Sequence, residues 1–239
     1  MDGGRIAGAS TARDREMKKD FWLERWDRGE IGFHQDEVNP YLIQYWPQLH
    51  LARDSVVFVP LCGKSRDMLW LRERGHRVLG VELSAVAVQA FFKENGYIPQ
   101  HVSQHQVTGG KFDRCEANGI RILCGDFFDL SKDDLADVGA AYDRASLIAL
   151  PPDMRERYSR HLVSILPPAT QILLVTVEYP QAEMQGPPFS VTSSEVATLY
   201  REYAEVRLLA QLDVLAKNPR FQERGLSRLQ ESIFLLTLR

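Results

Sequence analysis

The sequence predicts an α/β fold: a doubly wound, mostly parallel sheet that ends in antiparallel strands. Two short apolar runs, Ser55–Leu61 and Arg77–Leu83, each precede a helical segment. This strand-helix alternation usually folds as a parallel sheet with helices on both faces. A third run, Gln171–Glu178, is rich in β-branched residues, which favour strands. The last two predicted strands, near Glu205–Leu212 and Glu231–Thr237, can pair with each other in antiparallel fashion.

The first residues of the chain are excluded from this fold. Residues 1–16 are small and polar without periodicity, and a second methionine, Met17, follows them. We interpret them as a disordered leader or a remnant of cloning. Residues 17–239 are predicted to form a single domain, since this length suits one core better than two small ones.

A cluster of aromatic residues precedes the first strand of the sheet. Phe21, Trp22 and Trp26 are spaced for one face of a helix, and Gly29 and Gly32 interrupt the pattern after it. Glycine permits backbone angles that other residues resist, and such positions often serve as hinges. We therefore expect residues 20–50 to form a lid. The alternative is a fixed helix whose two tryptophans complete the core.

Local start and stop signals define the remaining elements. Asn39 before Pro40 begins a helix that runs to about Trp46, and Asn118-Gly119 indicates a tight hairpin. The other predicted elements are a helix over 65–74 ended by Gly75, a helix over 84–95, a polar loop over 97–110, hairpin strands over 111–117 and 120–124, a strand closing at Tyr142, a helix over 152–166, and a helix begun by a capping box of Thr192 and Glu195.

Composition excludes several classes of partner. The formal charge of −3 comes without a basic stripe, so we expect no nucleic-acid partner. No apolar run approaches the roughly 20 residues that cross a bilayer, and no secretory signal is evident, so we expect no membrane partner. Cys62, Cys115 and Cys124 form no CxxC pair, which suits a reducing compartment. We expect a cytoplasmic monomer that acts on a small molecule.

Two features at strand ends suggest a nucleoside-binding site. Ligands of such sheets lie beyond the carboxyl ends of the strands, where the strand order reverses. The turn after the first strand contains Gly63, which allows close backbone approach, but it has neither GxGxxG nor a phosphate-binding GxxxxGK[ST] loop. Glu82 ends the second strand, and its carboxylate can accept both hydroxyls of a ribose. The alternatives are an ordinary turn and a solvated glutamate.

Two later strand ends carry further candidates. Asp126 and Phe127 offer an adenine ring an acceptor for its amino group and a flat apolar wall. A capped turn with the phenylalanine in the core is the alternative. Arg144 follows the next strand, where a cation needs a ligand or a partner. The alternative is a structural ion pair of Arg144 with Asp143 or Glu178.

Metal and nucleophile chemistry are disfavoured. His101 and His105 are four residues apart but lie in a polar loop without a cysteine or acid at ligand spacing, so we expect no metal. Cys62 precedes a helix, where thiol pKa values fall, yet no partnered base is evident and a small buried cysteine is commoner.

Together these residues resemble the thiopurine S-methyltransferase family, particularly its bacterial members. The resemblance runs from Phe21 to Thr237 and is carried by FWLERWDRGEIGFHQDEVNPYL, VPLCGKSRDMLWL, GHRVLGVELS, CGDFFDL, YDRASLIALP, EYPQAEMQGPPFSV and FQERG. It implies a class I, Rossmann-like methyltransferase fold with seven strands and an N-terminal segment closing over the site. The implied cofactor is S-adenosylmethionine. The implied acceptor is the sulfur of an aromatic or heterocyclic thiol such as a thiopurine, with selenium or tellurium compounds as further acceptors.

The resemblance also implies roles for individual residues. Trp22, Trp26 and Phe33 would line the pocket, Leu61 would contact the cofactor, Glu82 would bind ribose, Asp126 and Phe127 would flank adenine, and Arg144 would face cofactor and acceptor. Arg224 resembles a second arginine on the acceptor side. His34 would accept a proton or position the lid. A nicotinamide oxidoreductase and a non-catalytic nucleoside-binding module are the rival functions on such a fold.

Overall fold

The fold is built on one continuous sheet. The computed structural model describes residues 12–32, 34–103 and 110–239. In these residues the strands are β1 (Val56–Val59), β2 (Arg77–Glu82), β3 (Gln100–Ser103), β4 (Asp113–Ala117), β5 (Ile120–Cys124), β6 (Val138–Arg144), β7 (Gln171–Glu178), β8 (Ala204–Asp213) and β9 (Gln230–Leu238). Their order across the sheet is β3-β4-β5-β2-β1-β6-β7-β9-β8.

This order confirms the predicted doubly wound sheet. Strands β5, β2, β1, β6 and β7 are parallel, and β9 runs antiparallel between β7 and β8. These seven strands match the expected number, and β3 and β4 extend the sheet beyond it. The chain order reverses at β1, which lies between β2 and β6, so a ligand is expected at the carboxyl ends of these strands.

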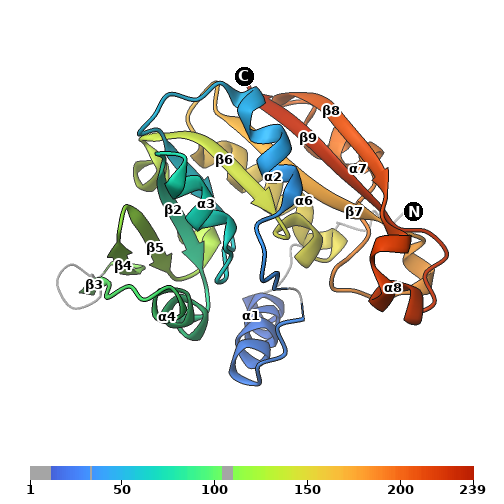
Figure 1. Cartoon of the computed structure of the whole chain (residues 1–239), viewed down its shortest axis with the longest axis horizontal. Coiled ribbons are helices and arrows are strands. Elements are labelled where there is room, and N and C mark those ends of the chain that lie inside the picture. The colour runs from blue at the N-terminus through green and yellow to red at the C-terminus, as the bar shows by residue number, and fades with distance from the viewer. Residues whose placement is uncertain (1–11, 33, 104–109) are drawn as a thin grey trace, which may run out of the picture.

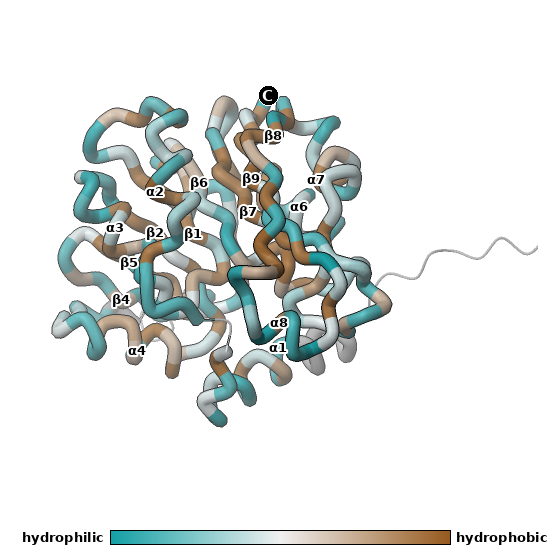
Figure 2. Tube along the Cα trace, turned by 45° about the vertical axis from the view of Figure 1, so that its right-hand side comes forward, coloured by the Kyte–Doolittle hydropathy of each residue, from teal (hydrophilic) through white to brown (hydrophobic). Residues whose placement is uncertain are grey.

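Helices cover both faces of the sheet (Figure 1). One core cluster joins the sheet to α2 (Pro40–Tyr45), α3 (Asp67–Glu73) and α4 (Ala85–Glu94), and the other joins it to α6 (Pro152–Ile165) and α7 (Ser193–Tyr200). Two further helices, α1 (Ala12–Asp27) and α8 (Pro219–Glu223), lie near the carboxyl ends of the strands. The apolar residues concentrate in the central strands (Figure 2). No helix within the described residues is long and apolar enough to cross a membrane.

The local start signals are confirmed, with one exception. The side chain of Asn39 accepts the backbone N–H of Tyr41 at 2.9 Å, and Thr192 caps α7 through the N–H of Glu195 at 3.1 Å. The expected return bond of a capping box is wrong, because Glu195 Oε1 instead accepts from Arg155 Nη1 at 2.6 Å. Arg155 is 1% exposed, and leaving its buried charge unpaired would cost more free energy than leaving one N–H at the helix end without the glutamate.

Two segments have more regular secondary structure than predicted. The predicted hairpin is confirmed, with positive φ at both Asn118 and Gly119, but the expected loop over 97–110 contains strand β3. This polar strand pairs with β4 at the sheet edge, where ladder hydrogen bonds need no apolar pattern. At the other end, residues 12–16, expected outside the fold, already belong to α1. Residues 1–11 lie outside the described part of the chain.

The expected lid segment, residues 20–50, divides into two parts. Its second part, α2 and the short 3-10 helix Trp46–Leu49, is built into the core, because Leu42, Trp46 and Leu49 are each at most 5% exposed. These residues cannot move without opening the packing of the sheet. The expected lid would therefore be restricted to the part before Asn39, and chiefly to α1.

Candidate functional site

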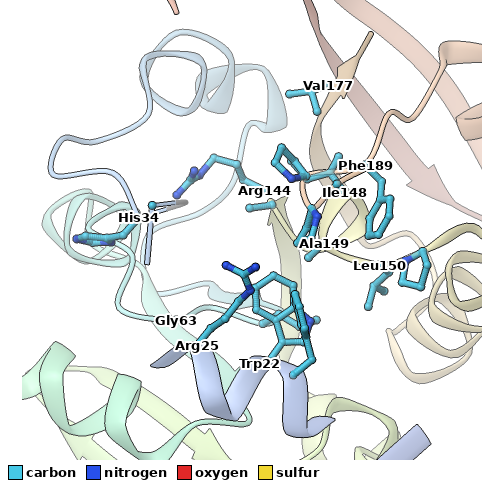
Figure 3. A pocket seen from close by; sticks show the side chains of 18 of the residues that line it. Trp22, Arg25, His34, Gly63, Arg144, Ile148, Ala149, Leu150, Val177 and Phe189 are labelled. Carbon is cyan, nitrogen blue, oxygen red and sulfur yellow. The ribbon is translucent and has the colours of Figure 1, made fainter. Parts of the chain in front are cut away.

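A cavity of about 1540 Å³ opens at the carboxyl ends of β1, β2, β6 and β7, where the reversal of strand order predicted a site. Helix α1 forms one side of it, and α8 contributes to the opposite side. Figure 3 shows two contrasting halves. Gly63, Arg25 and His34 lie in a polar half, and the other half is an apolar wall made of Ile148, Ala149, Leu150, Val177 and Phe189.

The backbone is strained where the two central strands enter the cavity. Leu61, after β1, has a φ of 43°, and Ala145, after β6, has a φ of 69°. Left-handed conformations cost residues other than glycine about 1–2 kcal/mol. The hydroxyl of Ser146 donates to the carbonyl of Pro60 at 2.9 Å and so ties the two turns together. Such outliers persist where the surroundings impose them, often at ligand sites.

Glu82 holds the turn after β1 in place. Its Oε2 accepts the N–H of Gly63 at 2.8 Å, and its Oε1 accepts the N–H of Ser84 at 2.8 Å. The side chain is 7% exposed, and burial raises its pKa against the opposing effect of these backbone donors. The solvated alternative is therefore wrong. Each carboxylate oxygen has a second lone pair, so Glu82 can still accept two hydroxyls from a ligand.

Asp126 and Phe127 form the capped turn and the buried ring that were considered as the alternative. Asp126 Oδ1 caps its turn by accepting the N–H of Phe128 at 3.0 Å, and its Oδ2 lies 2.7 Å from Lys19 Nζ of α1. Phe127 is 5% exposed and packs against Tyr158, with ring centroids 4.8 Å apart. Both nevertheless line the cavity. The lysine contact also attaches α1 to the end of β5.

Arg144 has a buried partner that sequence reasoning missed. Its Nε donates to Asp67 Oδ2 at 2.9 Å. The alternative of an ion pair is therefore correct in kind, but its partner is neither of the two acids named: the carboxylate of Asp143 accepts from Tyr158, and Glu178 pairs with Arg228. The sequence does place an acid, Asp67, in the first turn of the helix that follows β1. Nothing in the residues around it indicates that its carboxylate faces Arg144.

Asp67 is also bonded to the base of the N-terminal segment. Its Oδ1 accepts the backbone N–H of Asn39 at 2.8 Å, and its side chain is 1% exposed. One carboxylate therefore fixes both the guanidinium at the cavity and the residue at which α2 begins. This buried carboxylate is strongly held, since losing Arg144 would leave its charge uncompensated and losing the Asn39 N–H would leave an acceptor atom unsatisfied.

The N-terminal residues lie against the cavity as expected. Trp22 rises from α1 into it (Figure 3). Trp26 is 8% exposed and packs on Gly63, where a Cβ atom would meet Trp26 Cζ2 at 3.2 Å. His34 lies at the edge, and burial together with the charge of Lys64 lowers its pKa. Phe33, also expected in the pocket, lies outside the described residues.

Arg224 reaches the cavity from the opposite side. It ends α8, and its Nη1 lies 3.7 Å from Met184 Sδ. The structure therefore brings together all of the expected site residues that it describes. It adds Arg25 of α1 and the apolar wall, which sequence reasoning did not identify because apolar residues in loops carry no distinctive pattern.

Cys62 and His101 do not belong to the described lining of the cavity. Within the described residues no group of three or more His, Cys, Asp or Glu side chains could hold a metal ion. His101 Nδ1 lies 3.2 Å from Cys115 Sγ, and His105 lies outside those residues. Cys62 is buried against Gly80, and burial raises the pKa of its thiol, so it fits the small buried cysteine that we favoured.

Sequence comparisons give strong matches over nearly the whole chain. The sequence profile of a family described as Thiopurine S-methyltransferase (TPMT) matches residues 17–239. The chain is 64% identical over 223 residues to a thiopurine S-methyltransferase of Nitrosospira multiformis, a match covering 93% of this chain and 99% of that protein. It is 52% identical to the same-named protein of Azotobacter vinelandii, covering 93% and 100%.

Comparisons with solved structures identify the fold. A 1,6-didemethyltoxoflavin-N1-methyltransferase of Burkholderia thailandensis, solved with S-adenosylhomocysteine, matches with a TM-score of 0.59 at 19% identity, covering 98% of this chain and 92% of that one. An S-adenosylmethionine-dependent methyltransferase of Anabaena variabilis matches with a TM-score of 0.61 at 14% identity, covering 92% and 95%. The chain has the class I methyltransferase fold.

The packing of Trp26 on Gly63 generates a prediction. Gly63→Ala places a methyl group against the indole at a φ of 52°, whereas Gly96→Ala, at a φ of 69°, meets no atom within 4 Å. Both substitutions cost backbone strain of about 1–2 kcal/mol, but only the first crowds Trp26. We expect faster amide hydrogen exchange in α1 for Gly63→Ala alone. Equal exchange of α1 in the two variants would show that this contact does not hold the helix.

Proposed function

The chain belongs to the thiopurine S-methyltransferase family, and we propose that it methylates the sulfur of aromatic or heterocyclic thiols, thiopurines among them. It is a methyltransferase, and its cofactor is S-adenosylmethionine. Selenium and tellurium compounds are further candidate acceptors. The rival functions, an oxidoreductase and a non-catalytic module, are not favoured.

The two-sided cavity is the observation that carries this proposal. Glu82 is fixed by two backbone donors and keeps unused lone pairs, which fits the ribose of an adenosyl group. Asp126 and Phe127 stand at the neighbouring strand end, where adenine would lie. The apolar wall around Leu150 and Phe189 fits a flat aromatic acceptor better than a charged or sugar-like one.

The residues around the cavity can promote transfer mainly by positioning. S-adenosylmethionine supplies an activated methyl group on a positively charged sulfur. The aromatic faces of Trp22 and Trp26 can stabilise such a cation by about 0.5–2 kcal/mol. Holding acceptor and methyl in line can contribute roughly 7–11 kcal/mol. The walls that exclude water and orient the acceptor therefore matter more than the cation contact.

Arg144 is proposed to stabilise the acceptor sulfur. Its Nε is occupied by Asp67, so the guanidinium is held in one orientation with charge directed to the cavity. An aromatic thiol is acidic enough to arrive largely as thiolate and needs no strong base. For a less acidic thiol His34, whose lowered pKa keeps its imidazole neutral at pH 7, can accept the proton. Arg224 would face the acceptor from α8.

We further propose a cytoplasmic monomer with one catalytic domain over residues 17–239, acting on small molecules and not on nucleic acids or membranes. The three cysteines support a cytoplasmic location, since all of them are free thiols, as is usual in a reducing compartment. The weak formal charge of −3 supports the absence of a nucleic-acid partner.

A panel of acceptors tests the proposed substrate class. Thiophenols and thiopurines should yield S-adenosylhomocysteine, whereas the matched phenols and hydroxypurines should not. An oxygen nucleophile is less polarisable and, at neutral pH, mostly protonated. Selenols and tellurite complete the panel. The proposal would be contradicted if S-adenosylhomocysteine formed with no sulfur, selenium or tellurium acceptor of the panel.

Replacing Glu82 with glutamine should weaken cofactor binding. An amide has one acceptor atom where the carboxylate has two, so it cannot hold both Gly63 and Ser84 and also serve the ribose. Hydrogen bonds to charged groups contribute about 1.5–3 kcal/mol, so we expect the dissociation constant of S-adenosylhomocysteine to rise roughly tenfold to hundredfold. Calorimetry measures it, with Glu205→Gln on exposed β8 as control. Unchanged affinity in the Glu82 variant would remove this residue from the site.

The lid proposal predicts how α1 responds to ligand. Backbone amides from Phe21 to His34 should exchange quickly in the free protein and become protected when S-adenosylhomocysteine binds, while β7 changes little. A chain truncated to begin at Gln35 should stay folded and lose activity. Slow exchange throughout Phe21 to His34 without ligand would instead support the fixed helix, whose buried Trp26 completes the core.

A further inference from the structure

Arg25 is an arginine in the cavity without a strong partner. Its Nε is buried and donates to no atom of the described residues, and the carboxylate with which it forms an ion pair, Glu30, lies 3.7 Å from Nη1, beyond hydrogen-bond distance. Its guanidinium lies over the ring of Phe21, 4.6 Å from the centroid. Arg144 differs, because Asp67 and Ser65 already engage it. A half-buried guanidinium with open donors is suited to an anionic ligand.

The position of Arg25 indicates which ligand atoms it can reach. The next residue, Trp26, packs on Gly63, so this part of α1 lies beside the turn after β1. Glu82, the proposed ribose acceptor, is bonded to the same Gly63. Figure 3 shows the guanidinium rising from α1 into the polar half, away from the apolar wall. A ligand whose ribose lies at Glu82 would extend its amino-acid end past Gly63 toward Arg25.

We propose that Arg25 binds the carboxylate of the methionine portion of the cofactor. This inference rests on the proposed placement of the ribose at Glu82. Arg25 belongs to α1, so its contact would order this helix over the bound cofactor. The contact lies at a group that does not change during methyl transfer, so it contributes to binding and to closure and not to the chemical step.

Ligands that differ at the amino-acid end test the proposal. S-adenosylhomocysteine has the carboxylate, S-adenosyl-3-thiopropylamine lacks only this group, and 5′-methylthioadenosine lacks the whole amino-acid end. In Arg25→Met the dissociation constant of S-adenosylhomocysteine should rise about tenfold to hundredfold, while those of the other two ligands change less than about twofold. Arg25→Lys should lie between, because it keeps the charge without the planar fork.

Arg28→Met is the matched control. Arg28 follows the same helix, is 65% exposed, and pairs with Glu24 outside the cavity, so the affinities of all three ligands should stay unchanged. Equal weakening of the three ligands in Arg25→Met would show a structural role for Arg25. Unchanged binding of all three, or a raised KM for the thiol alone, would overturn the proposal. If the parent protein binds these ligands but methylates no thiol, the acceptor proposal fails while this one stands.

Discussion

The carboxylate of Glu82 is the point on which the site depends. By accepting the N–H groups of Gly63 and Ser84 it locks the turn after β1 to the end of β2. Trp26 packs on Gly63 in this turn, and this contact holds α1 beside the cavity. A single buried charge thus links the sheet, the proposed ribose position and the helix proposed to close over the site.

A second buried carboxylate organises the opposite side. Asp67 holds Arg144 at the cavity and the first residue before α2, Asn39, at the base of the N-terminal segment. The proposed movement of this segment would begin before Asn39, since the chain from Asn39 onward is packed in the core. The two acids thus act on different parts of the cavity. Glu82 fixes the turn on the side proposed for the cofactor, and Asp67 orients Arg144, the cation proposed to face the acceptor.

Much of this arrangement could be predicted because its signals are local. Apolar runs, helix caps and Asn118-Gly119 specify strands and turns within a few residues, and strand ends in parallel sheets converge on one edge. Glu82, Asp126 and Arg144 could thus be assigned to one site. Strand β3 could not, because a polar edge strand has no apolar period and exists through its partner β4. Nor did the sequence show that Leu61 and Ala145 adopt strained backbone angles.

The sequence by itself determined the fold class, the family and the motif residues that line the cavity, but not Arg25 or the apolar wall. Only the tertiary structure decided which of them are bound to one another. Asp67 pairs with Arg144, and Lys19 pairs with Asp126, across long stretches of chain. Arg25 has only a neighbour in sequence, Glu30, at 3.7 Å, and its Nε–H has no acceptor within the described residues. Charge pairing depends on distance in space and on burial, and neither is encoded in the spacing of residues along a chain.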